Sequence, residues 1–204
     1  VLEDGKGIRL VIPRWGVESR LFTGVEATHS MYRALEELIR GLNLHKRSFT
    51  IEVSPELPRA MGLGGSAALA VAVVRALSRH FGLDLSDSQV NQRAYNCEQV
   101  VHGTPSGIDN TVSTYGRFIL YRKPEMTELS VSRPIPIVIG LTGISGHTLE
   151  LVRRVREARE RTPELYDDMF NRIDQLVLAA REAVETYNLE TLGQLMNMTH
   201  GMLN

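Results

Sequence analysis

The sequence predicts an α+β fold in which strands and helices are mixed at first and helices alone follow. Alternating β-branched runs that are typical of strands, such as Phe49–Val53, fall before residue 130. From residue 148 to residue 203 the apolar residues recur with helical spacing. We therefore expect two domains, residues 1–130 with mixed elements and residues 131–204 that are mainly helical.

Local signals place the first elements. Ile8–Ile12 is a short apolar run that predicts a strand, and Pro13 and Gly16 follow it in a loop. Thr28 is a candidate N-cap for a helix that ends at Gly41, because glycine commonly follows the last helical turn. The strand at residues 49–53 comes next.

The middle of the chain contains two expected helices. An apolar helix follows a glycine-rich turn at residues 62–66 and stops at Gly82. Ser86 and Gln89 have the spacing of a capping box, which begins a second helix that runs to about Val101.

The remaining elements are predicted from residue 112 onward. Val112–Tyr115 and Phe118–Tyr121 are strand-like, Lys123–Pro134 is a turn or linker, and Ile135–Leu141 is a candidate buried strand. The predicted helices of the second part are Thr148–Arg161, Glu164–Tyr187 and Leu189–Leu203.

Composition excludes several classes of protein. The 204 residues include 23 basic and 24 acidic side chains, for a net charge of −1, so there is no basic field for nucleic acid. The longest apolar run, Ala67–Val74, is far too short to cross a bilayer. A single cysteine, Cys97, rules out an internal disulfide. We expect a cytoplasmic protein with small-molecule partners and no nucleic acid or membrane partner.

The glycine-rich turn is the strongest candidate for a binding site. Its glycines allow a positive φ and a close approach of the backbone to a ligand. The first N–H groups of the following helix, and the positive end of its dipole, point into the turn. Such a turn is a natural phosphate site. The alternative is a glycine-rich turn that simply precedes a buried helix.

Two known phosphate motifs were compared with this turn. It lacks the Gly-Lys-Ser/Thr ending of a P-loop. Gly62, Gly64 and Ala67 do fit the dinucleotide fingerprint, with Asp84 downstream for a ribose contact. However, Ser54–Pro58 separates the turn from its strand and no second parallel strand is expected to carry Asp84. The dinucleotide interpretation is therefore the weaker one.

Two carboxylates flank a polar loop after the second helix. Glu98 lies near the helix end, and Asp109 lies beyond the loop at residues 102–107. Together with Ser66 they supply oxygens that could hold Mg²⁺ and orient an attacking hydroxyl, which phosphoryl transfer requires. The alternatives are a solvated carboxylate for Glu98 and a turn or N-cap residue for Asp109.

Two segments, P-x-x-x-G-L-G-G-S-A-A (Pro58–Ala68) and E-x-x-x-H-G-T-P-S-G-I-D-N (Glu98–Asn110), closely resemble motifs of the mevalonate kinase family in the GHMP kinase superfamily. The resemblance covers nearly the whole chain. It implies a GHMP-kinase fold with a ribosomal protein S5-like α/β domain. Residues 1–130 would be the nucleotide-binding domain, and residues 131–204 the truncated helical start of the C-terminal domain.

The resemblance also implies an activity, the ATP-dependent phosphorylation of (R)-mevalonate to 5-phosphomevalonate in isoprenoid biosynthesis. Asp109 would be the catalytic base, and Ser66 and Glu98 would bind Mg²⁺. The residues that the resemblance assigns to the nucleotide are Pro58, Gly62, Leu63, Gly64, Gly65, Ser66 and Ala67.

The implied substrate residues are His102, Ser106, Gly107 and Thr148. For Thr148 an N-cap role, and for His102 a loop role with backbone partners, are the alternatives. A homodimer is a further expectation. The alternative functions are a related GHMP kinase that acts on another small alcohol, and a truncated homologue without catalysis.

The sequence also departs from the family pattern. Gly65-Ser66 stands where the family usually has two serines. The segments P-G-K…G-E-H and K-L-T-G-A-G-G-G-G are not found, and the first carries the lysine that partners the catalytic aspartate in the family. We therefore expect the chain to be an interior piece of a longer kinase.

Overall fold

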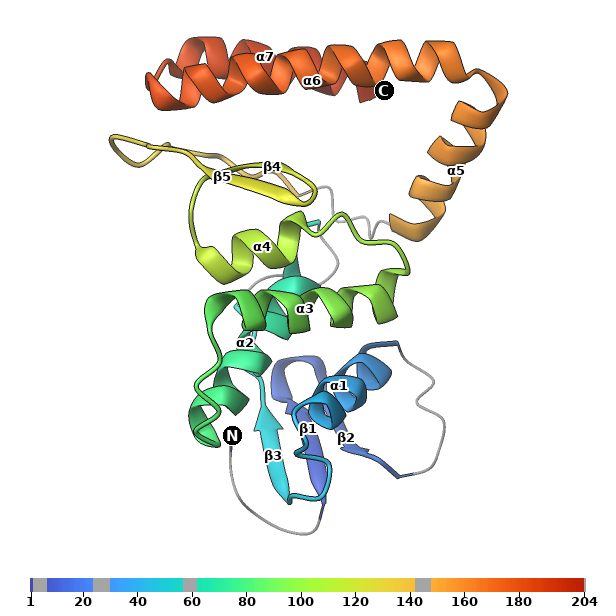
Figure 1. Cartoon of the computed structure of the whole chain (residues 1–204), viewed down its shortest axis with the longest axis vertical. Coiled ribbons are helices and arrows are strands. Elements are labelled where there is room, and N and C mark those ends of the chain that lie inside the picture. The colour runs from blue at the N-terminus through green and yellow to red at the C-terminus, as the bar shows by residue number, and fades with distance from the viewer. Residues whose placement is uncertain (2–6, 24–29, 57–61, 142–147, 204) are drawn as a thin grey trace. The chain divides into compact units, whose positions relative to one another are not determined.

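The structure is a computed structural model that describes residues 1, 7–23, 30–56, 62–141 and 148–203, except for the side chains of residues 148 and 149. The chain divides into two compact units, Val1–Gly116 and Arg117–Asn204 (Figure 1). The domain boundary near residue 130 stays a prediction, because compactness alone does not define the domains of a family.

The first unit contains a three-stranded sheet in the order β2-β1-β3. Strand β1 (Ile8–Ile12) pairs antiparallel with β2 (Val17–Leu21) and parallel with β3 (Phe49–Glu52), with Leu10 opposite Ser19 and Ile51. A 3₁₀ turn, η1 (Pro13–Trp15), joins the first two strands. Because alternate residues of β1 are fully buried, one face of the sheet packs on the core.

Strand β2 is an element that the sequence analysis missed, since it predicted only a loop after residue 12. Its sequence, VESRL, buries only Leu21 and leaves Glu18 and Arg20 exposed. This is an edge strand, and its polar outer face removes the apolar signal by which strands are recognised. Pairing with β1 fixes its conformation instead.

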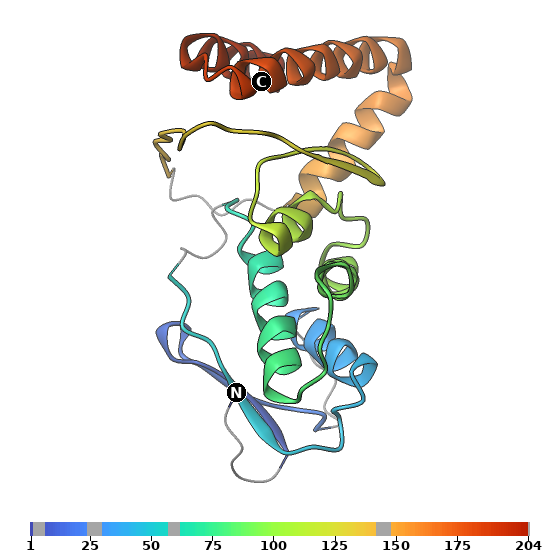
Figure 2. The same ribbon diagram turned by 60° about the vertical axis from the view of Figure 1, so that its left-hand side comes forward.

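The described part of the first unit also contains four helices, and Figure 2 shows them on one side of the sheet. They are α1 (Ser30–Gly41), α2 (Gly65–His80), α3 (Asp87–His102) and α4 (Ile108–Tyr115). Helices α1 and α2 pack with the sheet, and α3 packs on both of them. The largest fully buried side chains of this core are Phe49, Leu10, Ile12, Ile39, Leu77, Val74 and Val90.

The structure confirms several sequence predictions in this unit. Helix α1 ends at Gly41, and α2 ends at His80, two residues before Gly82. The capping box of α3 is formed, because the Gln89 backbone N–H donates to Ser86 Oγ at 3.3 Å and the Ser86 N–H donates to Gln89 Oε1 at 2.9 Å. The predicted N-cap Thr28 lies outside the described residues.

The strand predicted at Val112–Tyr115 is wrong, because these residues form the last turns of α4. The run Thr-Val-Ser-Thr has β-branched residues, but strand propensity is weak next to tertiary packing. Two αL glycines, Gly107 (φ 92°) and Gly116 (φ 62°), bound the segment. Between them Asn110, Thr111 and Thr114 are buried at helical spacing, against α2 and α3.

The second unit begins with a hairpin of β4 (Ile119–Arg122) and β5 (Glu125–Glu128), paired antiparallel. Strand β4 matches the strand predicted at residues 118–121, whereas β5 lies inside the predicted turn at residues 123–134. Its side chains are all exposed, so the sequence offered no apolar alternation.

The buried strand predicted at Ile135–Leu141 is also wrong. This segment has no regular secondary structure, and Val138 is 99% exposed. A continuous apolar run indicates burial only where a partner strand or helix covers it, and in the part of the chain that the structure describes no strand pairs with this run.

Three helices follow among the described residues of the second unit, and all three were predicted. They are α5 (Thr148–Arg161), α6 (Pro163–Glu185) and α7 (Leu189–Leu203). Helix α7 packs along α6 (Figure 1). Among the described residues, no helix combines the length and apolarity that crossing a membrane requires.

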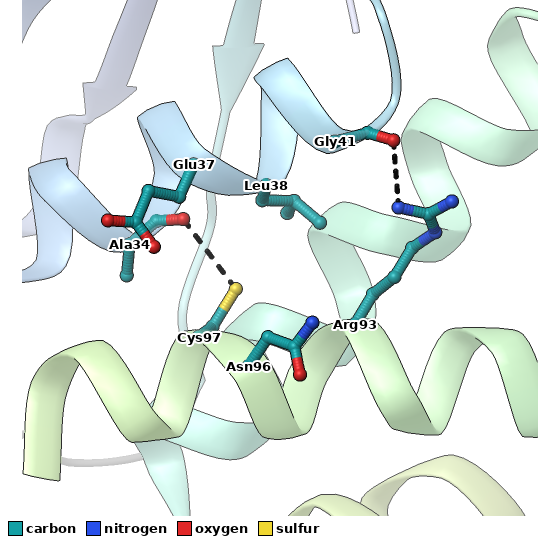
Figure 3. A pocket seen from close by; sticks show the side chains of 7 residues that line it. All are labelled: Ala34, Glu37, Leu38, Gly41, Arg93, Asn96 and Cys97. Carbon is teal, nitrogen blue, oxygen red and sulfur yellow. Dashed lines mark hydrogen bonds between the residues drawn. The ribbon is translucent and has the colours of Figure 1, made fainter. Parts of the chain in front are cut away.

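Cys97 lies at the contact between α3 and α1 (Figure 3). Its thiol is buried and donates to the Ala34 carbonyl, with an Sγ···O distance of 3.7 Å. Burial, and secondarily the charges of Glu98 and Glu37, raise the pKa of Cys97 from 9.0 to about 12. The thiolate is therefore strongly disfavoured while α1 and α3 remain packed.

We expect Cys97 to resist alkylation in the folded protein. At pH 8 its reaction with iodoacetamide, followed by mass spectrometry, should be on the order of 100-fold slower than in guanidinium chloride, because only the thiolate reacts. The folded-state pKa lies above the unfolded one, so this thiol should also make the free energy of unfolding fall as the pH rises from 9 toward 12. Equal alkylation rates with and without denaturant would contradict the buried position.

Candidate active site

The predicted phosphate turn leads directly into α2. Gly62 (φ 73°) and Gly64 (φ 65°) both adopt the left-handed conformation, which a glycine takes without strain. Gly64 is the N-cap of α2 and no side chain caps the helix. The first helical bond runs from Ala68 N–H to the Gly64 carbonyl, at 3.0 Å, which leaves the three preceding N–H groups without helical partners.

The other residues of the turn differ in exposure. Gly65 and Ser66 are exposed, Leu63 is half-buried and Ala67 is fully buried. The exposed start of α2 is therefore open to an anion, while Ala67 holds the helix in the core. Pro58, the first residue assigned to the nucleotide, lies outside the described residues.

Ser66 and Glu98, which are 32 positions apart, meet at this helix start. Ser66 Oγ donates to Glu98 Oε1 at 2.6 Å. That distance lies in the range of about 2.5–2.7 Å that is typical of a hydroxyl bonded to a carboxylate. Since α2 and α3 pack closely, the first turn of α2 and the last turn of α3 bring these two oxygens together.

Glu98 is 5% exposed, which is rare for a carboxylate. One hydrogen bond to a charged group contributes roughly 1.5–3 kcal/mol, whereas withdrawing a carboxylate from water costs several kcal/mol. Its other oxygen, Oε2, lies 3.6 Å from His102 Nε2. Among the described residues the partners of this carboxylate are one hydroxyl and one imidazole, so its buried negative charge is suited to bind a cation.

Asp109 lies in the first turn of α4, beside the glycine turn. A Cβ atom built on Gly64 would be 3.7 Å from Asp109 Oδ1 and 3.8 Å from its Cβ and Cγ atoms. The carboxylate therefore lies in van der Waals range of the N-cap of α2. The same helix start thus has Glu98 and Asp109 as neighbours, contributed by α3 and α4.

The substrate residues predicted between α3 and α4 shape the loop. Ser106 Oγ accepts from the Ile108 backbone N–H at 3.3 Å, and Gly107 is the N-cap of α4 with a φ of 92°. His102 is the last residue of α3. Thr148 begins α5 in the second unit and its side chain is not described, so its relation to the other three residues stays a prediction.

A protein-only metal cage is absent from the described residues, where no three His, Cys, Asp or Glu side chains converge. This arrangement is compatible with Mg²⁺, which usually binds one or two carboxylates together with water and substrate phosphates. Ser66 Oγ and Glu98 Oε1 offer such an incomplete set of oxygen ligands, at the helix end that favours phosphate.

The dinucleotide interpretation is not supported by the fold. Asp84 lies in the turn between α2 and α3, with a φ of 46°, and not at the end of a strand. Helix α2 is followed by α3, so the strand-helix-strand unit that this fingerprint requires is not formed around the turn.

A polar network next to Asp109 was not predicted from the sequence. The Asn91, Asn110 and Thr111 side chains are hydrogen-bonded to one another between α3 and α4. The sequence contained one signal, the seven-residue spacing from Asn91 to Glu98, which puts both on one face of α3. The spacing points to this network only once residues 108–115 are known to form a helix that packs on the same face of α3.

The sequence of this chain is similar to known kinases. The sequence profile of the GHMP kinases N terminal domain matches residues 29–117. The mevalonate kinase of Thermococcus sibiricus is 41% identical over 164 residues, which cover 78% of this chain and 49% of that protein. The mevalonate kinase of Thermococcus gammatolerans is 36% identical over 192 residues, which cover 92% and 57%. The chain spans about half the length of these curated relatives.

Solved structures show the same fold. The crystal structure of L. major mevalonate kinase in complex with R-mevalonate matches with a TM-score of 0.74 at 27% identity, over 98% of this chain and 63% of that one. The predicted α+β fold of GHMP-kinase type is therefore confirmed. Residues 29–117 form a GHMP kinase N-terminal domain, in a chain that is homologous to mevalonate kinases.

Proposed function

We propose that the whole protein containing this chain phosphorylates (R)-mevalonate with ATP and releases 5-phosphomevalonate. The observation that carries the proposal is the meeting of Ser66, Glu98 and Asp109 at the glycine-capped start of α2. The homologues at 36–41% identity are mevalonate kinases. This chain spans about half of their length, so the activity is proposed for the whole protein.

The glycine turn would bind the ATP phosphates. The turn presents the exposed residues Gly62, Gly65 and Ser66, the positive end of a helix dipole and N–H groups without helical partners, which together attract anions. Ser66 and Glu98 would hold Mg²⁺, whose role is to neutralise charge on the phosphates. For Pro58 a nucleotide-binding role rests on the family resemblance alone.

Asp109 would act as the base. It would take the proton of the mevalonate hydroxyl as that oxygen forms a bond to the γ-phosphorus of ATP. The bond from the γ-phosphorus to its bridging oxygen breaks, and ADP leaves. Because phosphoryl transfer depends on positioning and electrostatics, a carboxylate beside the phosphate turn is suited to this role.

The rest of the substrate site is proposed from the loop between α3 and α4. His102, Ser106 and Gly107 would face mevalonate near the base, and the role of Thr148 rests on the family resemblance alone. A cytoplasmic location, a homodimer and the lack of nucleic acid and membrane partners stay predictions.

The substrate is tested with the purified full-length protein. We expect ADP release, followed by a coupled assay, to depend on (R)-mevalonate and on Mg²⁺. The comparison panel should contain other small alcohols that GHMP kinases accept, including galactose and homoserine. Faster turnover of another alcohol would replace mevalonate as the substrate, and no turnover with any alcohol would refute the kinase proposal.

We expect Asp109→Asn to lower kcat by roughly 10²- to 10⁴-fold, the usual contribution of a general base. The KM for ATP should change little, because the amide has the size of the carboxylate. The control is Asp168→Asn, which removes an exposed carboxylate that pairs with Arg172 on α6. Near-normal turnover by Asp109→Asn would remove this residue from the mechanism.

We expect Glu98→Gln to raise the Mg²⁺ concentration for half-maximal activity by roughly 10- to 100-fold. Losing even a residue that only hydrogen-bonds to a metal ligand lowers metal affinity by about that factor. The glutamine keeps an acceptor for Ser66 Oγ but loses the charge. Glu52→Gln, at the exposed end of β3, is the control. An unchanged Mg²⁺ titration would show that Glu98 is not a ligand.

Gly64→Ala separates backbone strain from the proximity of Asp109. The alanine would have to adopt a left-handed φ, which costs roughly 1–2 kcal/mol in stability. Its Cβ would contact the Asp109 carboxylate. Gly82→Ala imposes the same strain (φ 60°) with nothing within 4 Å. We expect both variants to lose thermal stability, but only Gly64→Ala to lose kcat. Equal activity of the two variants would argue against a site at Gly64.

A further inference from the structure

Helix α4, which carries Asp109, is anchored by a partly buried chain of hydrogen bonds that runs through the half-buried Asn91. Asn110 and Thr111 are each 3% exposed. Asn110 Nδ2 donates to Asn91 Oδ1 at 2.6 Å, and Asn91 Nδ2 donates to Thr111 Oγ1 at 3.3 Å. Thr111 Oγ1 in turn donates to the Gly107 carbonyl at 2.6 Å.

These bonds have one consistent direction. Asn91 accepts a hydrogen bond from Asn110, the residue after Asp109, and donates one to Thr111. The Thr111 hydroxyl donates to the carbonyl of Gly107, the N-cap of α4. Buried amide and hydroxyl groups are costly when unpaired, so a satisfied network of this kind holds a single arrangement. Asn91 thus joins the first turn of α4, including the backbone on each side of Asp109, to the middle of α3.

Asn91 also relates Asp109 to Glu98. Asn91 and Glu98 are both on α3, seven positions or about two turns apart, and therefore lie on one face of that helix. Glu98 bonds to Ser66 at the start of α2, while Asn91 bonds to α4. One rigid helix face thereby sets the position of the metal-binding carboxylate against that of the base.

The far end of α4 has its own attachment. Arg75 on α2 donates through Nη2 to the Thr114 carbonyl at 2.8 Å, and the same nitrogen pairs with Asp87 at 2.8 Å. Helix α4 is eight residues long and would hardly be stable alone. Held at the C-terminal end by Arg75, it depends on Asn91 for the placement of its N-terminal end.

We propose that Asn91 is a positioning residue for phosphoryl transfer: its side chain, through Asn110 and Thr111, fixes the first turn of α4 and hence Asp109. The kinetic part of this proposal rests on the proposed function, in which Asp109 is the base. The structural part, that Asn91 holds the first turn of α4, stands on the hydrogen bonds alone.

The kinetic test uses Asn91→Ala in the full-length protein. We expect kcat to fall roughly 10- to 100-fold, as small misplacements of a catalytic group do. The KM for ATP and the Mg²⁺ requirement should stay within about twofold, because Ser66 and Glu98 are untouched. The matched control is Asn96→Ala, an exposed asparagine of α3 that bonds only to Gln92 among the described side chains. A normal kcat in Asn91→Ala, or a rise in the KM for ATP alone, would overturn the proposal.

Two further variants separate positioning from general loss of structure. Asn91→Asp keeps the acceptor for Asn110, so we expect it to recover most of the lost kcat. The double variant Asn91→Ala with Asn110→Ala should be no slower than the slower single variant, because both remove the same bond. No recovery in Asn91→Asp, or fully multiplicative losses in the double variant, would contradict action through Asn110.

Amide hydrogen exchange gives a readout that does not need activity. Without substrate, exchange at residues 107–112 should be on the order of tenfold faster in Asn91→Ala and unchanged in Asn96→Ala. If the wild-type protein phosphorylated no alcohol, the proposed function would fail while this measurement still decided whether Asn91 anchors α4. Unchanged exchange in Asn91→Ala would refute the anchoring role, whatever the activity.

Discussion

The hydrogen bond from Ser66 Oγ to Glu98 Oε1 is the interaction on which the candidate site depends. It joins the exposed first turn of α2 to a carboxylate that is 5% exposed at the end of α3. Among the described residues, Ser66 donates to this carboxylate and His102 Nε2 lies 3.6 Å from its other oxygen. Because withdrawing a carboxylate from water is costly, the proposed cation would stabilise the charge at this position.

The fold creates this position by packing three helices whose relevant ends meet. Helix α2 contributes its N-terminus, α3 its last turn and α4 its first turn. Small residues allow the approach, because Gly64 lies where a side chain would contact Asp109 and Ala67 is fully buried. The packing thereby brings the N–H groups at the start of α2 close to the carboxylates of Glu98 and Asp109. Without that packing, two like charges would separate.

Helix α3 connects the parts of the site to the core. One of its faces carries Asn91 and Glu98, while Cys97 and Arg93 contact α1 on another, as the Sγ bond to Ala34 and the 3.0 Å bond from Arg93 to Gly41 show (Figure 3). A helix fixed on both sides has little freedom to tilt. The position of Glu98 on α3 is therefore set by the helix packing of the core.

The sequence by itself determined the α+β class, the glycine turn, the capping box of α3 and the helices of the second part, because each depends on neighbouring residues. It also named Ser66, Glu98 and Asp109, although largely through resemblance to a family. Only the tertiary structure decided that Val112–Tyr115 is helical, that β2 is a strand, that residues 136–141 are exposed and that Asn91 bonds to the residue after Asp109. The physical reason is that helix caps and glycine conformations are local, whereas strand pairing, burial and cross-helix hydrogen bonds depend on partners far away in the chain.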